Sequence, residues 1–444
     1  MPQQLRRTFN LKDLVMIVIG TVIGSGIFIV PAVVLQQTGG SVNLALLVWF
    51  FAGVLSFLGA LTYGELGAMA PEAGGLYVYI REAFGPLPAF LYGWTLFFVM
   101  GNCAVATLAV AFASYFSQLL PLSPLLKQIV ATLMIVAVTI INILGTRKSA
   151  NVQNWTTGVK VGAIIIMSAA LLTLGDGFSP AGGSLLPDTI NMSLLTGVGL
   201  AMVAVLWAYE GWQYVTYSAG EALNPQRTFP AGIAIGTAAL IVIYLLANVA
   251  YLAALGPVRA AQSETVAAEA VAMMMGPAAG KLIAAAILVS MFSAANAIFL
   301  TTSRVYFMMA RDGVFFERFG ELHPRYGTPW QAIGWSAVCA IAFAISGTFE
   351  QLLTYVVFAG WIFYALGAMS IFVYRRRHPE MPRPFRVPGY PWTPILFVLS
   401  AAAIVLNTLV SQPGRAMVGI AAVLLGAPAF FIWKARRRAA VGSS

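Results

Sequence analysis

Charged residues are scarce in this sequence. Only 9% of its 444 residues are Asp, Glu, Lys or Arg, whereas 60% are hydrophobic. Soluble globular domains carry about 25% charged residues, so the composition excludes that class. Cysteine and histidine are rarer still, with two of each. Both cysteines, Cys103 and Cys339, lie in apolar runs, and His323 and His378 lie in polar segments. This pattern excludes a disulfide framework and predicts neither a metal site nor a cofactor.

Long apolar segments take up most of the chain. We predict twelve membrane spans in one membrane domain, residues 1–444, and most reach the ~20 residues that a helix needs to cross the hydrocarbon core. The spans cover residues 14–36, 43–69, 87–119, 125–144, 150–174, 191–220, 231–255, 281–310, 332–346, 351–374, 394–411 and 414–433. The ninth is short, and the third, sixth and eighth are long enough to imply a tilt or a break. The outer loop 256–280 is expected to hold a short helix over residues 266–275.

The basic residues orient these spans. Of the 25 lysines and arginines, four fall in predicted outer loops and Lys160 falls inside a span, which leaves 20 on the side of both termini. Such an excess is typical of cytoplasmic segments. We therefore expect a multi-pass protein of the cell (inner or plasma) membrane with both termini cytoplasmic. The net charge of +10 suits loops that face the anionic inner leaflet of the lipid bilayer, so no nucleic-acid partner is expected. The first run shows no cleavage site and is interpreted as a retained helix, not as a signal peptide.

Two spans contain interruptions with glycine. Residues 22–28 (VIGSGIF) interrupt the first span and residues 207–212 (WAYEGW) interrupt the sixth. Glycine destabilises a helix interior by ~1 kcal/mol, and unwound backbone at membrane depth is tolerated only where it lines a cavity or is buried in protein. Interrupted helices at corresponding places in two halves are typical of the binding site of a secondary transporter.

The free backbone groups at such breaks have opposite preferences. The N–H groups that open the next half-helix favour a carboxylate, and the C=O groups that end the previous half favour an ammonium group. A zwitterionic α-amino acid carries both. The alternative is that Gly24, Ser25 and Gly26 are small only to let helices pack.

Gly24, Lys160 and Glu210 lie at one predicted depth. Each is 11 or 12 residues from a charged residue at the inner end of its span, which is ~16–18 Å at 1.5 Å per residue and close to the middle of a ~30 Å core. Lys160 should therefore face the protein interior, as a structural cation that holds the first break or as a proton carrier. Glu210 either pairs with Lys160, the substrate ammonium or a proton, or orders backbone N–H groups of the break. Trp207 gates the site, covers an apolar substrate side chain or only packs, and Glu65 is expected to pair near a helix end.

Several motifs resemble those of the amino acid-polyamine-organocation (APC) superfamily along nearly the whole chain. They are residues 20–28 (GTVIGSGIF), 63–67 (YGELG), 224–227 (NPQR) and 383–391 (RPFRVPGYP). Residues 208–212 (AYEGW), together with Lys160, are most similar to the L-amino acid transporter (LAT) branch and its bacterial relatives. The resemblance implies an all-α, LeuT-type fold of two inverted five-helix repeats, residues 14–174 and 191–374, with two extra helices over 394–433.

The resemblance also implies roles for individual residues. Ser25 and Gly26 would hold the substrate carboxylate, and the carbonyl groups of Val22, Ile23, Trp207 and Ala208 would hold the amine. Lys160 would replace the sodium site, which implies sodium-independent amino acid movement. The candidate substrate-binding residues are Val22, Ile23, Gly24, Ser25, Gly26, Trp207, Ala208, Glu210 and Gly211.

Two departures from the family pattern affect these expectations. Mammalian members have a cysteine after the third span that bonds an accessory glycoprotein, whereas residues 119–126 contain none, so no disulfide-linked subunit is expected. Glu210 stands where many LAT members carry a small residue, which leaves the substrate range open. We expect exchange of small or neutral amino acids, with a proton-coupled cationic amino acid or polyamine permease as the alternative. A transporter-like sensor and an intramembrane enzyme are not favoured, because the sequence shows neither a long cytoplasmic tail nor a catalytic constellation.

Overall fold

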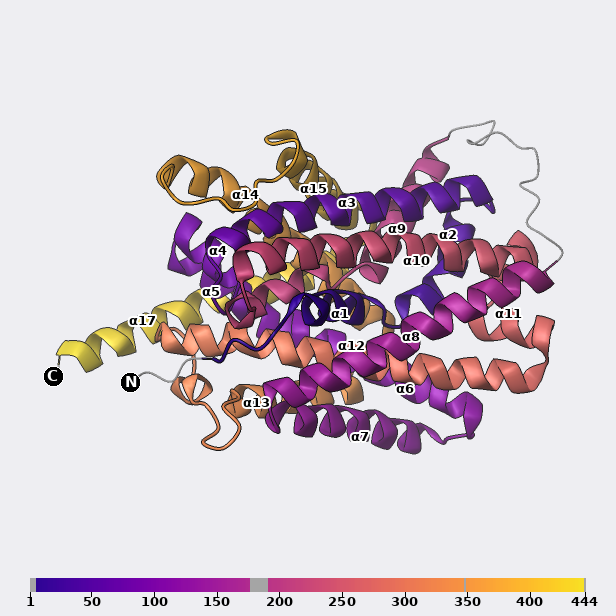
Figure 1. The fold of residues 1–444 in the computed structure, drawn as a ribbon, viewed down its shortest axis with the longest axis horizontal. Coiled ribbons are helices and arrows are strands. Elements are labelled where there is room, and N and C mark those ends of the chain that lie inside the picture. The colour runs from indigo at the N-terminus through magenta and orange to yellow at the C-terminus, as the bar shows by residue number, and fades with distance from the viewer. Residues whose placement is uncertain (1–4, 176–190, 347–348, 443–444) are drawn as a thin grey trace.

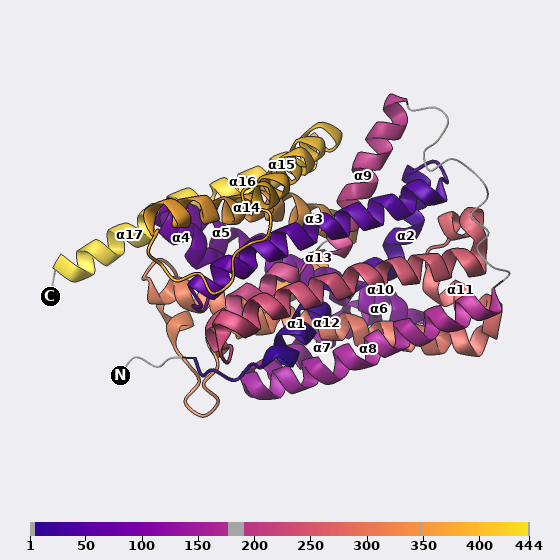
Figure 2. The same ribbon diagram turned by 45° about the horizontal axis from the view of Figure 1, so that its top comes forward.

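The computed structural model describes residues 5–175, 191–346 and 349–442, and its regular elements in these ranges are helices. Figures 1 and 2 show long helices that run roughly along the longest axis of the molecule. Residues 5–10 and helix α17 lie toward the same end in both views. Helices suit a membrane because each satisfies its backbone hydrogen bonds within one segment.

The helices differ widely in length, from short connecting turns to spans of more than 30 residues. In chain order they are α1 (Leu11–Val22), α2 (Gly26–Gln37), α3 (Val42–Met69), α4 (Leu76–Phe84), α5 (Pro86–Thr95), η1 (Leu96–Met100), α6 (Gly101–Leu119), α7 (Pro124–Ile143), α8 (Thr146–Leu174), α9 (Met192–Ala208), η2 (Trp212–Glu221), α10 (Pro225–Gln262), α11 (Val266–Met275), α12 (Pro277–Arg311), η3 (Glu317–Gly320), α13 (Trp330–Ser346), α14 (Phe349–Arg377), α15 (Trp392–Ser411), α16 (Pro413–Leu424) and α17 (Gly426–Gly442).

These helices cover all twelve predicted spans. In the described ranges, ten spans are long and apolar enough to cross a membrane, and the bent pair α1–α2 makes eleven. The remaining predicted span is α13, which has 17 residues and was expected to be short. The long third span contains the π-helical turn η1, and the sixth breaks after α9, whereas α12 runs through 35 residues without a break. Helix α11 has the bounds predicted for the outer loop. The architecture is all-α and polytopic, consistent with a LeuT-type fold, and the repeat boundaries remain a prediction.

A capping box fixes the start of the first span. The Asn10 side chain accepts a hydrogen bond from the Asp13 amide at 3.0 Å, and the Asp13 carboxylate accepts one from the Asn10 amide at 2.9 Å. This reciprocal pattern satisfies two free amides at a helix start. Asp13 is fully buried and also accepts hydrogen bonds from Arg147 at 2.7 Å and Asn154 at 2.6 Å. The same carboxylate therefore caps α1 and joins it to the first turns of α8.

A buried ion pair joins three helices at the same end of the bundle. Arg304 of α12 donates to both carboxylate oxygens of Glu221, at 2.7 and 3.1 Å, and to the Thr146 hydroxyl at 2.9 Å. Both charged side chains are 1% exposed. Bidentate geometry and a third partner offset the cost of removing such charges from water. The pair thus connects α12 to the end of η2 and the start of α8.

Glu65 anchors the segment between α14 and α15. Its buried carboxylate accepts hydrogen bonds from Arg375 at 2.8 and 2.7 Å and from the Val387 amide at 2.6 Å. The predicted pairing role of Glu65 is therefore confirmed. The Arg375 guanidinium also lies 3.6 Å from the centre of the Tyr390 ring, an additional cation–π contact.

Candidate functional site

The first break separates α1 from α2 by three residues. The two helices bend by 47° at this point, and the Gly24 amide donates to the Val22 carbonyl at 2.8 Å. The first N–H groups of a helix have no partner within it, so the N-cap Ser25 and the first α2 residues, Gly26 and Ile27, present their amides at the break. The Ser25 hydroxyl is buried and has no hydrogen-bond partner in the described part of the chain. This end of α2 is suited to bind an anion.

The second break lies between α9 and the 3-10 helix η2. The Tyr209 amide bonds the Val205 carbonyl and the Glu210 amide bonds the Trp207 carbonyl, each at 2.9 Å. The chain then turns at Gly211, whose φ is +123°, a backbone conformation that other residues rarely adopt. A Cβ atom at Gly211 would lie 3.0 Å from the Thr21 carbonyl carbon. The turn therefore brings η2 directly against the end of α1.

The structure brings the two breaks into contact. A Cβ atom at Gly26 would lie 2.7 Å from the Ala208 Cα atom, so α2 begins directly against the end of α9. The Tyr244 hydroxyl of α10 lies 3.1 Å from the Val22 carbonyl oxygen and 2.9 Å from the Ala208 carbonyl oxygen. The phenol thus lies between the carbonyl ends of both half-helices, and its one proton is shared between them.

Lys160 lies against the first break. Its side chain is buried, and Nζ donates to the carbonyl oxygens of Gly20 at 2.8 Å and Ile23 at 2.6 Å. The Ser290 hydroxyl of α12 donates to the same Ile23 oxygen at 3.0 Å. The prediction that Lys160 faces the interior is confirmed. Its ammonium group satisfies carbonyl groups that the end of α1 leaves without helical partners.

Buried polar side chains continue from Lys160 along the interface of α8 and α12. Gln153 donates to the Ser293 hydroxyl at 3.1 Å and accepts from the Asn296 side chain at 3.0 Å. The Thr156 hydroxyl donates to Ser293 at 2.9 Å. A Cβ atom at Gly20 would lie 1.8 Å from the Gln153 Nε2 atom. This cluster therefore packs tightly against α1 at Gly20, just before the break.

Glu210 lies at the second break without contacting Lys160. Its Oε1 atom accepts hydrogen bonds from the Gln213 side chain at 2.7 Å and from the Tyr364 hydroxyl. Gln213 in turn accepts a hydrogen bond from the Gly211 amide at 3.2 Å. Among the described residues Lys160 and Glu210 form no ion pair, so that alternative for Glu210 is not realised in this structure. Glu210 does help to order an amide of the break, because it binds Gln213, which accepts the hydrogen bond from the Gly211 amide.

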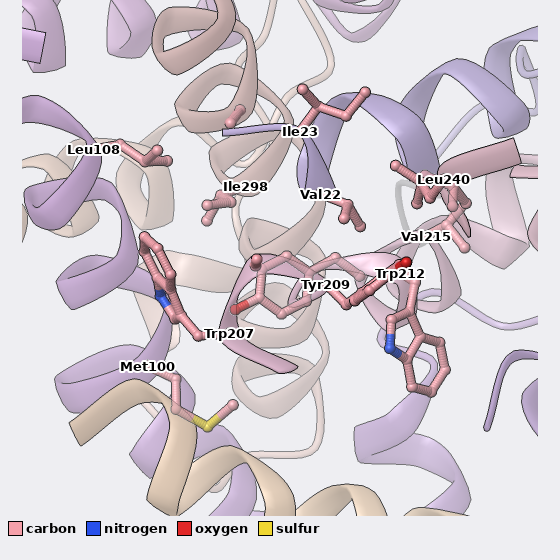
Figure 3. Close-up of a cluster of buried hydrophobic side chains, with 14 of the residues drawn as sticks. Val22, Ile23, Met100, Leu108, Trp207, Tyr209, Trp212, Val215, Leu240 and Ile298 are labelled. Carbon is pink, nitrogen blue, oxygen red and sulfur yellow. The ribbon is translucent and has the colours of Figure 1, made fainter. Parts of the chain in front are cut away.

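The aromatic residues of the second break point in different directions. Figure 3 shows Trp207 and Trp212 on opposite sides of Tyr209, with Trp207 between Leu108 and Met100 in this view. Trp207 is 9% exposed, and its ring would lie 3.4 Å from a Cβ atom at Gly26. It therefore covers the start of α2, whereas Trp212 packs on Tyr63.

The sequence analysis missed four side chains at these breaks. They come from η2, α10, α12 and α14 and are Gln213, Tyr244, Ser290 and Tyr364. Each is a polar side chain within a predicted apolar span, or next to a break, and this is the signal that could have drawn attention to them. Several other buried hydroxyl groups share that signal, so it does not single them out.

The four carbonyl groups expected to hold an amine are not equally available. A carbonyl oxygen has two lone pairs. Val22 already accepts from Gly24 and Tyr244, and Ile23 accepts from Lys160 and Ser290. Trp207 accepts from the amides of Tyr209 and Glu210. Ala208 accepts from the Tyr244 hydroxyl, which leaves its oxygen the most open of the four to a new donor.

Sequence comparisons show the family of this chain. The profile of the family described as "Amino acid permease" matches residues 9–427. The chain is 30% identical over 437 residues to the serine/threonine exchanger SteT of Bacillus subtilis, with 98% of each chain covered. The chain belongs to the amino acid permease family.

Two mammalian relatives also match most of the chain. The b(0,+)-type amino acid transporter 1 of Mus musculus is 33% identical over 416 residues, covering 92% of this chain and 84% of its own. The large neutral amino acids transporter small subunit 2 of Rattus norvegicus is 30% identical over 439 residues, covering 96% and 81%. The predicted place in the LAT branch of the APC superfamily is confirmed, as is the prediction of a multi-pass transporter that is not an enzyme. Because the rat relative is named a small subunit, the expected lack of an accessory subunit in this permease stays a prediction.

Proposed function

We propose that this permease exchanges small or neutral L-amino acids across the cell membrane without sodium, with both termini in the cytoplasm. Transport would proceed by alternating access, with the substrate bound between the two breaks. The observation that carries the proposal is the position of the Lys160 ammonium group, 2.8 and 2.6 Å from two carbonyl oxygens of the first break. The relative from Bacillus subtilis, which is named an exchanger, supports exchange over net uptake.

A zwitterionic amino acid fits the free groups at these breaks. The carboxylate would accept hydrogen bonds from the amides of Ser25 and Gly26 and from the Ser25 hydroxyl, which has no other partner among the described residues. The ammonium group would lie against carbonyl groups at the end of α9, with Ala208 as its principal acceptor. Opposite charges at the two ends of the substrate would thus face a helix start and a helix end.

Lys160 supports sodium independence through simple electrostatics. Backbone carbonyl oxygens are the ligands that a sodium ion would use at a broken helix. Here the ammonium group donates to the Gly20 and Ile23 oxygens from a buried position. A second cation at the same oxygens would face unscreened repulsion at short range.

Glu210 supports an alternative, a proton-coupled permease for cationic amino acids or polyamines. Both of its hydrogen bonds fall on Oε1, from Gln213 and Tyr364, and the side chain is only half-buried. Its second carboxylate oxygen could therefore face a substrate cation. A polyamine has no carboxylate and would gain nothing from the amides of Ser25 and Gly26, so the free Ser25 hydroxyl favours amino acids.

Uptake into liposomes tests the proposal. Purified permease is reconstituted into vesicles that are either empty or loaded with serine, and uptake of labelled serine is measured with sodium or choline outside and with or without an acid-outside gradient. We expect rapid uptake only into loaded vesicles, equal in sodium and choline. Steep sodium dependence would overturn sodium independence. Accumulation in empty, acid-outside vesicles that the Glu210→Gln variant loses would favour the alternative.

A further inference from the structure

A groove lies between α6, α8 and α12, away from the two breaks. Its volume is about 770 Å³, and apolar side chains of all three helices line it, among them Phe112, Trp155, Leu288 and Phe292. Trp155 is 68% exposed, which places it at the open rim. Figure 1 shows α7 and α8 close together at their shared connection and diverging from there, with α6 and α12 between them in this view. The groove is therefore part of the outer wall of the bundle and faces the bilayer.

The groove is separated from the proposed amino acid site. Thr156 lies in its lining, and the Thr156 hydroxyl bonds Ser293 on the inner side at 2.9 Å. Behind Ser293 lie Gln153 and then the first span. A zwitterion in the groove would meet apolar side chains and lose its hydration without compensation. The occupant must therefore be largely apolar.

A lysine marks one end of this groove. Lys148 precedes Asn151, Val152 and Trp155 by three, four and seven residues on α8, spacings that place all four on one helix face. Lys148 is exposed, and none of the acidic side chains that the structure describes forms an ion pair with it. It lies ~10 Å from Trp155 toward the start of α8, at 1.5 Å per residue. In the proposed orientation this is the cytoplasmic leaflet, which carries anionic lipids.

We propose that the groove binds an anionic phospholipid, with one acyl chain against Phe112, Leu288 and Phe292 and the phosphate against Lys148. Apolar lining and a single unpaired cation at one end match the two parts of such a lipid. Only the choice of leaflet depends on the proposed orientation, and binding in detergent is independent of both orientation and transport.

Native mass spectrometry of the purified full chain tests this inference. The protein in detergent is titrated with phosphatidylglycerol or with phosphatidylcholine of the same acyl chains, and the first bound lipid is counted. We expect phosphatidylglycerol to bind more tightly. Lys148→Gln should weaken phosphatidylglycerol binding about fivefold, the effect of losing one basic residue near an anionic surface. It should leave the binding of phosphatidylcholine unchanged. Lys281 is an exposed lysine near the start of α12. The matched control Lys281→Gln should change the binding of neither lipid.

A second variant tests the chain-binding part of the groove. Val289→Trp places a large side chain in the lining and should reduce binding of both lipids, whereas Lys148→Gln affects the anionic lipid alone. Because Lys148 is exposed, its variant should fold whether or not Val289→Trp does. Equal binding of the two lipids by the unmodified protein, or no effect of Lys148→Gln, would overturn the inference. A dimer that Val289→Trp dissociates would assign the groove to a second copy of the chain instead.

Discussion

The Nζ atom of Lys160 lies 2.6 Å from the Ile23 carbonyl oxygen, across the interface between the fifth span and the broken first span. The same oxygen accepts the Ser290 hydroxyl at 3.0 Å. Three helices therefore meet at one carbonyl group that an intact helix would have satisfied internally. The break is thus held open by side chains from two distant segments, and its shape depends on them.

Lys160→Met removes the charge while keeping a side chain of similar length. The buried Gly20 oxygen loses its side-chain donor, which costs roughly 1–3 kcal/mol, and the Ile23 oxygen keeps only the Ser290 hydroxyl, so the break should relax. We expect serine exchange in loaded liposomes to fall at least tenfold, with residual substrate binding. Lys281→Met, at an exposed lysine of α12, serves as the control. Exchange at the unmodified rate by Lys160→Met would show that the lysine is not needed to shape the break.

Tyr244→Phe isolates the hydroxyl group that bridges the two breaks. It removes the single O–H donor that lies within hydrogen-bond reach of the Val22 and Ala208 oxygens. One hydrogen bond contributes ~0.5–1.5 kcal/mol, so exchange should fall roughly two- to tenfold. Tyr251 lies two turns later on α10 and is also buried, but its hydroxyl has no partner among the described residues. Tyr251→Phe should therefore leave the exchange rate unchanged. Similar rates for the two variants would contradict a bridging role.

Local signals in the sequence predicted the breaks and the depth of Lys160. Glycines within an apolar run and one charge far from both ends of a span are costly in a membrane helix, so their positions are informative without any knowledge of contacts. The bounds predicted for the short helix of the outer loop are also those of α11. Hydropathy over about 20 residues predicted twelve spans, because span length is set by the bilayer, and eleven of them are long and apolar enough in the described ranges.

Partners across the bundle could not be predicted in this way. Tyr244 is one of 16 tyrosines, and no feature of its own segment distinguishes it from Tyr251. Likewise, the sequence placed Glu210 and Lys160 at one depth but could not give their directions around the helix axis. Glu210 points to Gln213 and Tyr364 because η2 turns at Gly211. Side-chain direction at a non-helical turn depends on tertiary packing and not on helical periodicity.

Ser25→Ala separates substrate recognition from helix packing. The Ser25 hydroxyl is buried without a partner among the described residues, so removing it should leave the melting temperature of the substrate-free protein unchanged or slightly higher. If the hydroxyl binds the substrate carboxylate, KM for serine should rise about three- to tenfold. The stabilisation of the protein by added serine should shrink accordingly.

The Ser25→Ala variant is more informative about substrate recognition than a Gly26→Val variant. A Cβ atom added at Gly26 would lie 2.7 Å from the Ala208 Cα atom, so Gly26→Val would disturb the contact between the breaks even if no carboxylate bound there. An unchanged KM in Ser25→Ala, together with normal exchange, would remove the hydroxyl from the proposed site.

Arg304→Met tests the buried ion pair at the end of the bundle. It leaves the Glu221 carboxylate, 1% exposed, without its bidentate partner, and an uncompensated buried charge costs about 3–5 kcal/mol. We expect the melting temperature of the purified protein to fall by several degrees. Arg259→Met breaks the pair with Glu269, whose side chains are 54% and 31% exposed. Surface pairs contribute about 0–1 kcal/mol, so this control should melt close to the unmodified protein.

Adding Glu221→Gln to Arg304→Met removes the unpaired charge and should recover part of the loss in melting temperature. No recovery in the double variant would mean that Arg304 stabilises the protein mainly through packing and its bond to Thr146, and not through Glu221.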